Sequence, residues 1–172
     1  MGETEHALTG PIATRLDWRR LYEAHAGELL RYLRKLVGDG ERASELMQDT
    51  FVRAMDREAS LRDAGDVRPW LYRIATNLAI EHLRRRKRIA FLPFARDHAN
   101  GGELFDPTAD LVRRSLAAIA PDQAATLVLC LQEGFSRREV ATLMKVSEET
   151  VKSRLARGRA AFAAAYRRLD PR

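Results

Sequence analysis

Residues 133–160 read EGFSRREVATLMKVSEETVKSRLARGRA, and this stretch decides the fold that the sequence predicts. Ser136 and Glu139 have the spacing of a capping box, in which each side chain accepts a hydrogen bond from a free backbone N–H at the start of a helix. Ser147 can cap a second helix after a short turn at residues 144–146. Two capped helices joined by so short a turn predict a helix-turn-helix. An ordinary helical hairpin with a charged outer face is the alternative.

The second helix of this motif is basic on its outer face, while Val151 and Leu155 lie four residues apart and hold it against the first helix. Such a helix fits the major groove of DNA, where its N-terminal side chains reach base edges and later arginines reach phosphates. The residues predicted to contact DNA are Ser147, Glu148, Thr150, Lys152, Ser153, Arg154 and Arg157, followed by Arg159. Lys145 occupies the turn position where glycine is common, and a left-handed backbone there costs roughly 1 kcal/mol or more.

Apolar residues recur at helical spacing through the rest of the chain, and no strand pattern appears. Helices are expected at residues 17–37, 41–57, 66–88, 110–119, 121–132, 136–143 and 147–168. Residues 89–109 hold two prolines and two adjacent glycines without a sustained period, which indicates a flexible linker at a domain boundary. The predicted fold class is therefore all-α, with two small helical domains. The expected boundaries are a loose tail at 1–15, a first domain at 16–92, a linker at 93–111 and a second domain at 112–170.

Positive charge is concentrated in two separate blocks of the chain. Residues 61–96 hold nine basic and three acidic side chains, and residues 134–172 hold ten and four, so each block has a net charge of +6. The remaining residues are net acidic. Two basic blocks on one chain indicate two contacts with a polyanion, most simply nucleic acid. Solvated helix faces are the alternative, and they explain one such block more easily than two.

Several functional classes find no support in the sequence. No apolar run approaches the roughly 18 residues of a membrane-spanning helix, and the N-terminus does not resemble a signal peptide, so we expect a cytoplasmic protein. Cys130 is the single cysteine and is interpreted as a small core residue. The four histidines, His6, His25, His82 and His98, have no metal-ligand spacing. Because no phosphate-binding loop or nucleophile elbow appears either, we expect neither an enzyme nor a cofactor.

Three stretches together resemble one protein family. ERASELMQDTFVRAM at 41–55 and VRPWLYRIATNLAIEHLRRRKR at 67–88 look like the signature stretches of the first conserved domain of extracytoplasmic-function (ECF) sigma factors, group IV of the sigma-70 family. Residues 116–160 look like the second domain of that family. The resemblance covers about residues 16–90 and 112–168 in the family's order.

This resemblance implies that the chain directs RNA polymerase core to promoters and initiates transcription. The first domain would bind the clamp helices of the β′ subunit and the single-stranded −10 element. The second domain would bind the β flap and the duplex −35 element. The resemblance also implies regulation by an anti-sigma factor that masks both domains.

Carried onto this sequence, the polymerase contact falls on Glu45, Gln48 and Asp49, with Leu46 and Phe51 interpreted as core residues. The residues expected to bind the −10 element are Arg73, Asn77, Arg84, Arg85 and Arg88, and the loop at 58–66 would hold a flipped base. Trp70 could stack on a base, but its helical spacing with Ile74 and Leu78 favours the core. The basic run at 84–88 alone is equally compatible with a solvated helix end.

A stand-alone helix-turn-helix regulator is the main alternative function. Its N-terminal half would be a sensor or dimerisation domain, yet residues 16–90 show no heptad seam and no sign of a ligand pocket. A regulator should bind duplex promoter DNA tightly by itself, whereas a sigma factor should do so mainly after joining core polymerase.

Overall fold

The computed structural model describes residues 16–61, 67–90 and 106–170, and within these ranges helices joined by short turns make up the chain, with no strand. The elements are α1 (Trp18–Val37), α2 (Gly40–Asp56), the 3-10 helix η1 (Glu58–Ser60), α3 (Val67–Ala90), α4 (Pro107–Ala118), α5 (Pro121–Leu131), α6 (Arg137–Met144) and α7 (Glu148–Leu169). The all-α prediction is confirmed. Across the same ranges, no helix combines the length and the apolar character needed to span a membrane.

Local signals in the sequence set the helix ends. The side chain of Asp17 caps α1 by accepting a hydrogen bond from the backbone N–H of Arg20 at 3.1 Å, as the sequence indicates. Gly38 ends α1 with a left-handed φ of 75°. The start of α4 differs from expectation, because Asp106 caps the helix and Pro107 occupies its first turn. Residues 107–111, predicted as linker, are therefore helical.

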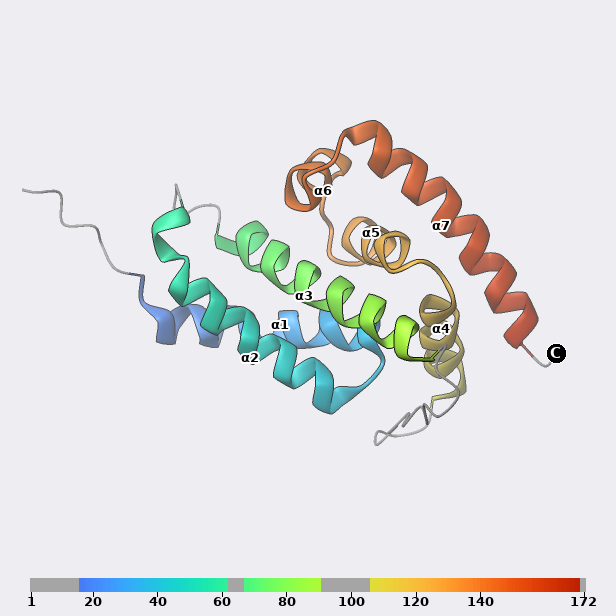
Figure 1. Ribbon diagram of the computed structural model, residues 1–172, viewed down its shortest axis with the longest axis horizontal. Coiled ribbons are helices and arrows are strands. Elements are labelled where there is room, and N and C mark those ends of the chain that lie inside the picture. The colour runs from blue at the N-terminus through green and yellow to red at the C-terminus, as the bar shows by residue number, and fades with distance from the viewer. Residues whose placement is uncertain (1–15, 62–66, 91–105, 171–172) are drawn as a thin grey trace, which may run out of the picture.

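The first three helices form one packed unit and the last four form another (Figure 1). In the first unit, α1, α2 and α3 pack against one another around side chains such as Leu33, Phe51 and Leu71, each at most 2% exposed. In the second, α5 is the central helix, and α4, α6 and α7 surround it. Val140 of α6 and Val151 of α7 are fully buried there, which fixes the two helices of the helix-turn-helix against the scaffold.

The two units share one continuous apolar core. Helices α1 and α3 contact α5, α3 also contacts α6, and α1 contacts α4. Helix α7 packs on α4, α5 and α6 instead, so α5 and α6 lie between α3 and α7 (Figure 1). The two cationic helices α3 and α7 are therefore not buried against each other, although the units that carry them are in direct contact.

Gly158 allows α7 to approach α5 closely. A Cβ atom at this position would lie 3.2 Å from Leu127 Cδ1 and 3.3 Å from the Cβ of Gln123. Since both distances are tighter than ordinary carbon contacts, glycine is the residue that fits this crossing.

Candidate functional site

The helix-turn-helix has the local structure that its sequence predicts. The hydroxyl of Ser136 accepts a hydrogen bond from the backbone N–H of Glu139 at 3.2 Å, and the Glu139 carboxylate accepts one from the backbone N–H of Ser136 at 2.7 Å. These hydrogen bonds lower the pKa of the Glu139 carboxyl. Lys145 ends α6 with a left-handed backbone, φ 53° and ψ 49°, and is the one non-glycine residue with positive φ among the residues described. The strain expected at this turn is present.

Ser147 acts as the N-cap of α7. Its hydroxyl accepts a hydrogen bond from the backbone N–H of Thr150 at 3.1 Å and shares a second, of 2.9 Å, with the Thr150 hydroxyl. Both side chains lie at the exposed N-terminal end of the helix, where backbone N–H groups and the helix dipole also favour an anion. Ser147 thus orients the start of the predicted recognition helix.

The other predicted −35 contacts divide between two sides of α7. At about 100° per residue, Thr150, Ser153, Arg154 and Arg157 lie within an arc of about 100°. Arg157 donates a hydrogen bond to the Ser153 hydroxyl at 2.8 Å, which joins two members of this strip. Arg154 is half-buried, with its guanidinium 3.9 Å from Met144 Sδ.

Glu148 and Lys152 lie on the opposite flank of α7, about 100° or more from this strip. Both are exposed, and the Lys152 ammonium is 3.6 Å from the Glu149 carboxylate. Arg159, grouped with the DNA-facing residues in the sequence, lies about 140° from Arg154 around the helix and lines a pocket on the other side. Arg159 therefore does not share the strip of Thr150, Ser153, Arg154 and Arg157, although it is exposed.

Four of the five predicted −10 residues share one stripe of α3. Arg73, Asn77, Arg84 and Arg88 lie within about 60° of one another around the helix axis, and all except half-buried Arg73 are exposed. Arg85 lies outside this stripe, where its guanidinium donates to the Glu81 carboxylate at 2.8 Å.

The α3 stripe lies next to α5 at one end. Arg84 donates to the Asp122 carboxylate of α5 at 2.8 Å. Trp70 is 5% exposed and packs near Trp18, so its predicted core role is confirmed. The predicted base-binding loop is described only as far as Leu61, and residues 62–66 lie outside the described residues.

His82 lies on the face of α3 that packs toward α2. The Nε of Arg42 donates a hydrogen bond to Nδ1 of His82 at 3.2 Å, so that ring nitrogen serves as an acceptor. Burial lowers the pKa of His82, and the cationic groups of Arg42, Arg86 and Arg85 lower it further. The imidazole therefore resists protonation in the folded chain.

The predicted polymerase-binding residues are exposed on α2. Glu45, Gln48 and Asp49 face solvent, and Glu45 accepts a hydrogen bond of 2.5 Å from Arg42. Leu46 is 2% exposed and belongs to the core, as predicted.

The same stripe of α2 continues into two apolar residues that the sequence interpretation missed. Val52 is 56% exposed and Met55 is 47% exposed, although Phe51 beside them is buried. Their spacing from Glu45 and Gln48, in steps of three or four residues, is the signal that could have identified them. We call the exposed residues Glu45, Gln48, Asp49, Val52 and Met55 the α2 stripe.

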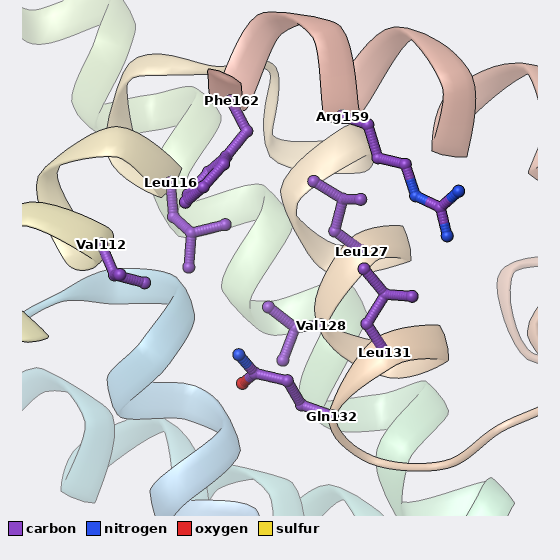
Figure 2. Close-up of a pocket in the computed structure, with 8 residues that line it drawn as sticks. All are labelled: Val112, Leu116, Leu127, Val128, Leu131, Gln132, Arg159 and Phe162. Carbon is purple, nitrogen blue, oxygen red and sulfur yellow. The ribbon is translucent and has the colours of Figure 1, made fainter. Parts of the chain in front are cut away.

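An apolar pocket of about 210 Å³ opens between α4, α5 and α7 (Figure 2). Its apolar lining comprises Val112, Leu116, Leu127, Val128, Leu131 and Phe162, with Gln132 and Arg159 as its polar members. Leu131, which lines this pocket, is 56% exposed. An apolar pocket beside an exposed leucine is suited to receiving an apolar side chain of a partner.

Two family models match this chain, one on each helical unit. The model described as Sigma-70 region 2 matches residues 21–89, and the model described as Sigma-70, region 4 matches residues 109–162. The chain is 31% identical over 145 residues to the ECF RNA polymerase sigma factor SigL of Mycobacterium tuberculosis, across 80% of this chain and 81% of SigL. This chain belongs to the ECF sigma factors.

A second relative is longer than the matched region. This sigma factor is 33% identical over 161 residues to the ECF RNA polymerase sigma factor SigE of Mycolicibacterium smegmatis. That alignment covers 88% of this chain and 62% of SigE, so the chain spans about three fifths of that relative's length.

Two solved structures share this fold. The sigma factor RpoE of Bartonella quintana, solved with the anti-sigma factor NepR, matches with a TM-score of 0.67 and 23% identity, over 88% of this chain and 97% of RpoE. CnrH, solved with the cytosolic domain of CnrY, matches with a TM-score of 0.64 and 23% identity, over 86% of this chain and 85% of CnrH. The two-unit helical architecture of this ECF sigma factor is thus that of its structural relatives.

Proposed function

We propose that this sigma factor joins core RNA polymerase in the cytoplasm and directs it to promoters by binding two DNA elements, with no catalysis of its own. The observation that carries the proposal is the distribution of surfaces over the two family regions. Region 2 carries the α2 stripe and the basic stripe of α3, while region 4 carries the partly exposed strip of α7. Two separate cationic surfaces on one chain suit two separate stretches of nucleic acid.

The α2 stripe is the proposed contact with the clamp helices of the β′ subunit. Glu45, Gln48 and Asp49 supply acceptors for basic side chains of the polymerase. Val52 and Met55 add apolar area that a partner would remove from water. A surface that combines an apolar patch with charged neighbours is typical of a specific protein interface.

The α3 stripe is the proposed contact with the melted −10 element. Asn77 is exposed and can form paired hydrogen bonds with a base edge. The guanidinium groups of Arg73, Arg84 and Arg88 can hold phosphates or stack on unpaired bases. This arrangement suits single-stranded DNA, in which bases and backbone are both accessible.

The strip of Thr150, Ser153, Arg154 and Arg157 on α7 is the proposed contact with the −35 duplex. Its first turn is held by the Ser147 cap, which lets base-reading side chains start from a fixed backbone. Lys152 and Glu148, on the other flank, would face the groove wall instead of the base edges.

The apolar pocket beside Leu131 is the proposed docking site for the β flap. The pocket lies between α4, α5 and α7, and α7 carries the DNA-facing strip on a different side, so flap and DNA could bind together. An apolar side chain of the flap would cover Leu131 and fill the space next to Phe162.

We also propose that an anti-sigma factor regulates this chain. RpoE of Bartonella quintana was solved with the anti-sigma factor NepR, and its fold is the one found here. The exposed apolar residues of both units, Val52, Met55 and Leu131, provide area that such a partner could cover.

Reconstitution with core polymerase and promoter-dependent run-off transcription tests the proposed function. The expected result is a transcript of defined length that requires the chain, core enzyme and a cognate promoter together. Tight binding of duplex promoter DNA by the chain alone, with no effect of core enzyme, would instead indicate a stand-alone regulator.

A further inference from the structure

The side chain of Met144 lies where three helices of the second unit meet. Met144 is the last residue of α6 and is half-buried. The left-handed Lys145 that follows it ends the helix, and the backbone N–H of Val146 donates to the carbonyl of Ala141 at 3.0 Å. This C-terminal cap fixes the backbone from which the Met144 side chain starts.

The Met144 sulfur lies between α5 and α7. On one side, the hydroxyl oxygen of fully buried Thr126 in α5 is 3.5 Å from Sδ. That hydroxyl donates to the backbone carbonyl of Asp122 at 2.6 Å, so its own helix sets its position. On the other side, Nη1 of Arg154 in α7 is 3.9 Å from Sδ. The sulfur therefore connects a fixed buried residue with a residue of the proposed −35 contact.

The Arg154 side chain leaves α7 at the edge of the buried face of that helix. Arg154 follows fully buried Val151 by three residues, which is about 60° around the helix, and it is half-buried. Within the part of the chain that the structure describes, no carboxylate pairs with Arg154, and the Met144 sulfur is the one acceptor in contact with its guanidinium. Arg157 differs, because it donates to the Ser153 hydroxyl.

A thioether is suited to orienting a cation without neutralising it. Thioether sulfur is a polarisable but weak acceptor. A carboxylate in the same place would form a strong charge-assisted pair that competes with DNA for the guanidinium. The contact with Sδ involves one N–H of Nη1, so the other donors stay available for the paired hydrogen bonds that arginine makes with a guanine edge. Holding the side chain in advance reduces the entropy that is lost on binding.

We propose that Met144 is a positioning residue for DNA recognition, whose sulfur holds the Arg154 guanidinium in the orientation that reads one base pair of the −35 element. This inference rests on the proposed function, in which Arg154 contacts that element. Met144 acts through Arg154, so removal of the sulfur should change DNA binding only while the guanidinium is present. The two residues should therefore be energetically coupled.

A double-variant cycle in the complex of the chain with core polymerase tests this coupling. Met144→Leu removes the sulfur at similar side-chain volume, and Arg154→Ala removes the guanidinium. The probe is a fluorescently labelled duplex that carries the −35 element of a promoter active in run-off transcription, and anisotropy gives its Kd. Met144→Leu should raise this Kd about threefold, at the low end of the coupling between residues in contact. In the Arg154→Ala background, the same change should leave the Kd unaltered.

Base discrimination separates positioning from general stability. With duplexes changed at single base pairs of the −35 element, Met144→Leu should lower discrimination at the base pair where Arg154→Ala also lowers it. Met47→Leu is the matched control, because it makes the same substitution at a core residue of α2 that is 6% exposed. This control should leave discrimination unchanged. Urea unfolding of each variant reports any loss of stability, which would weaken binding to every duplex alike.

A measurement without DNA tests the contact itself. Nitrogen NMR relaxation of the Arg154 side chain in the free chain should give a lower order parameter in Met144→Leu than in the unmodified chain. An unchanged order parameter would overturn the contact.

The DNA measurements distinguish failure of this inference from failure of the proposed function. Additive effects of Met144→Leu and Arg154→Ala, or full base discrimination by Met144→Leu, would overturn the inference and leave the −35 contact of Arg154 in place. A loss in Arg154→Ala that is equal for all duplexes would make Arg154 a phosphate contact and would also overturn the inference. Unchanged binding by Arg154→Ala would reject the proposed −35 contact and the inference with it.

Discussion

The exposed fractions of Val52 and Met55, at the apolar end of the α2 stripe, set how much binding to core polymerase their truncation should cost. Val52 is 56% exposed and Met55 is 47% exposed, so about half of each side chain is free for a partner to cover. Full burial of such a side chain contributes about 1.5–3 kcal/mol, so half of it contributes about 1 kcal/mol. Truncating both to alanine should therefore cost about 2 kcal/mol of binding to core polymerase, which is about a 30-fold higher Kd.

Fluorescence anisotropy of a labelled chain titrated with core polymerase, in the absence of DNA, measures this Kd. Ile89→Ala is the control, because Ile89 is 48% exposed but lies on α3 rather than on the stripe. The double variant should unfold in urea at the same midpoint as the unmodified chain, since the truncated atoms are largely solvated. An unchanged Kd, or an equal loss in Ile89→Ala, would refute the placement of the interface on α2.

Three further outcomes are expected. Arg154→Ala should weaken −35 binding by roughly 1–3 kcal/mol for the cognate sequence if the side chain reads a base, and competition with altered sequences should show whether the loss is uniform, which would make it a phosphate contact. Lys145→Gly should raise the free energy of unfolding by up to about 1 kcal/mol, because glycine relieves the left-handed strain at φ 53°; urea titration measures this. Because the pKa of His82 in the folded chain lies below its ordinary value of 6.5, the unfolded chain binds more protons in the window below pH 6.5. The free energy of unfolding should therefore fall as the pH drops through that window, and His82→Gln should reduce this dependence in urea titrations at pH 7.5 and 5.5.

Capping residues allowed many helix ends to be predicted from the sequence. Three capping signals predict helix starts, and the structure has helices at each of them: Asp17, the Ser136–Glu139 capping box and Ser147. The start of α4 carries the same kind of signal at Asp106 and Pro107, but the sequence interpretation counted Pro107 as evidence for a linker. Propensity and capping act within a few residues, so they fix ends better than boundaries between units.

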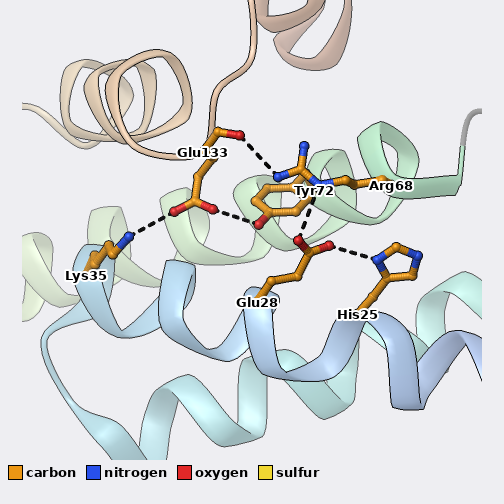
Figure 3. Close-up of polar contacts among 6 residues, drawn as sticks. All are labelled: His25, Glu28, Lys35, Arg68, Tyr72 and Glu133. Carbon is orange, nitrogen blue, oxygen red and sulfur yellow. Dashed lines mark hydrogen bonds and ion pairs between the residues drawn. The ribbon is translucent and has the colours of Figure 1, made fainter.

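Contacts between the units could not be read in this way. Glu133 looks like an ordinary polar residue between two helices, and only the fold brings Tyr72 and Lys35 to its carboxylate (Figure 3). In the candidate site, too, features that depend on contacts between helices could not be predicted from the sequence. Helical spacing groups Arg73, Asn77 and Arg84 correctly on one stripe, whereas the exposure of Val52 depends on which face the neighbouring helices cover.

The missing side chain at Gly158 sets how closely α7, the proposed recognition helix, crosses α5. Thr150 lies eight residues toward the N-terminus, about 12 Å along the axis, so a displacement of α7 at its crossing with Leu127 would be carried to the end that is proposed to read DNA. An alanine at this position would place its Cβ 3.2 Å from Leu127 Cδ1 and 3.3 Å from the Cβ of Gln123, so these neighbours or the helix itself would have to shift by a few tenths of an ångström. Under the proposed function, base reading at one end of α7 depends on an atom that is absent near its middle.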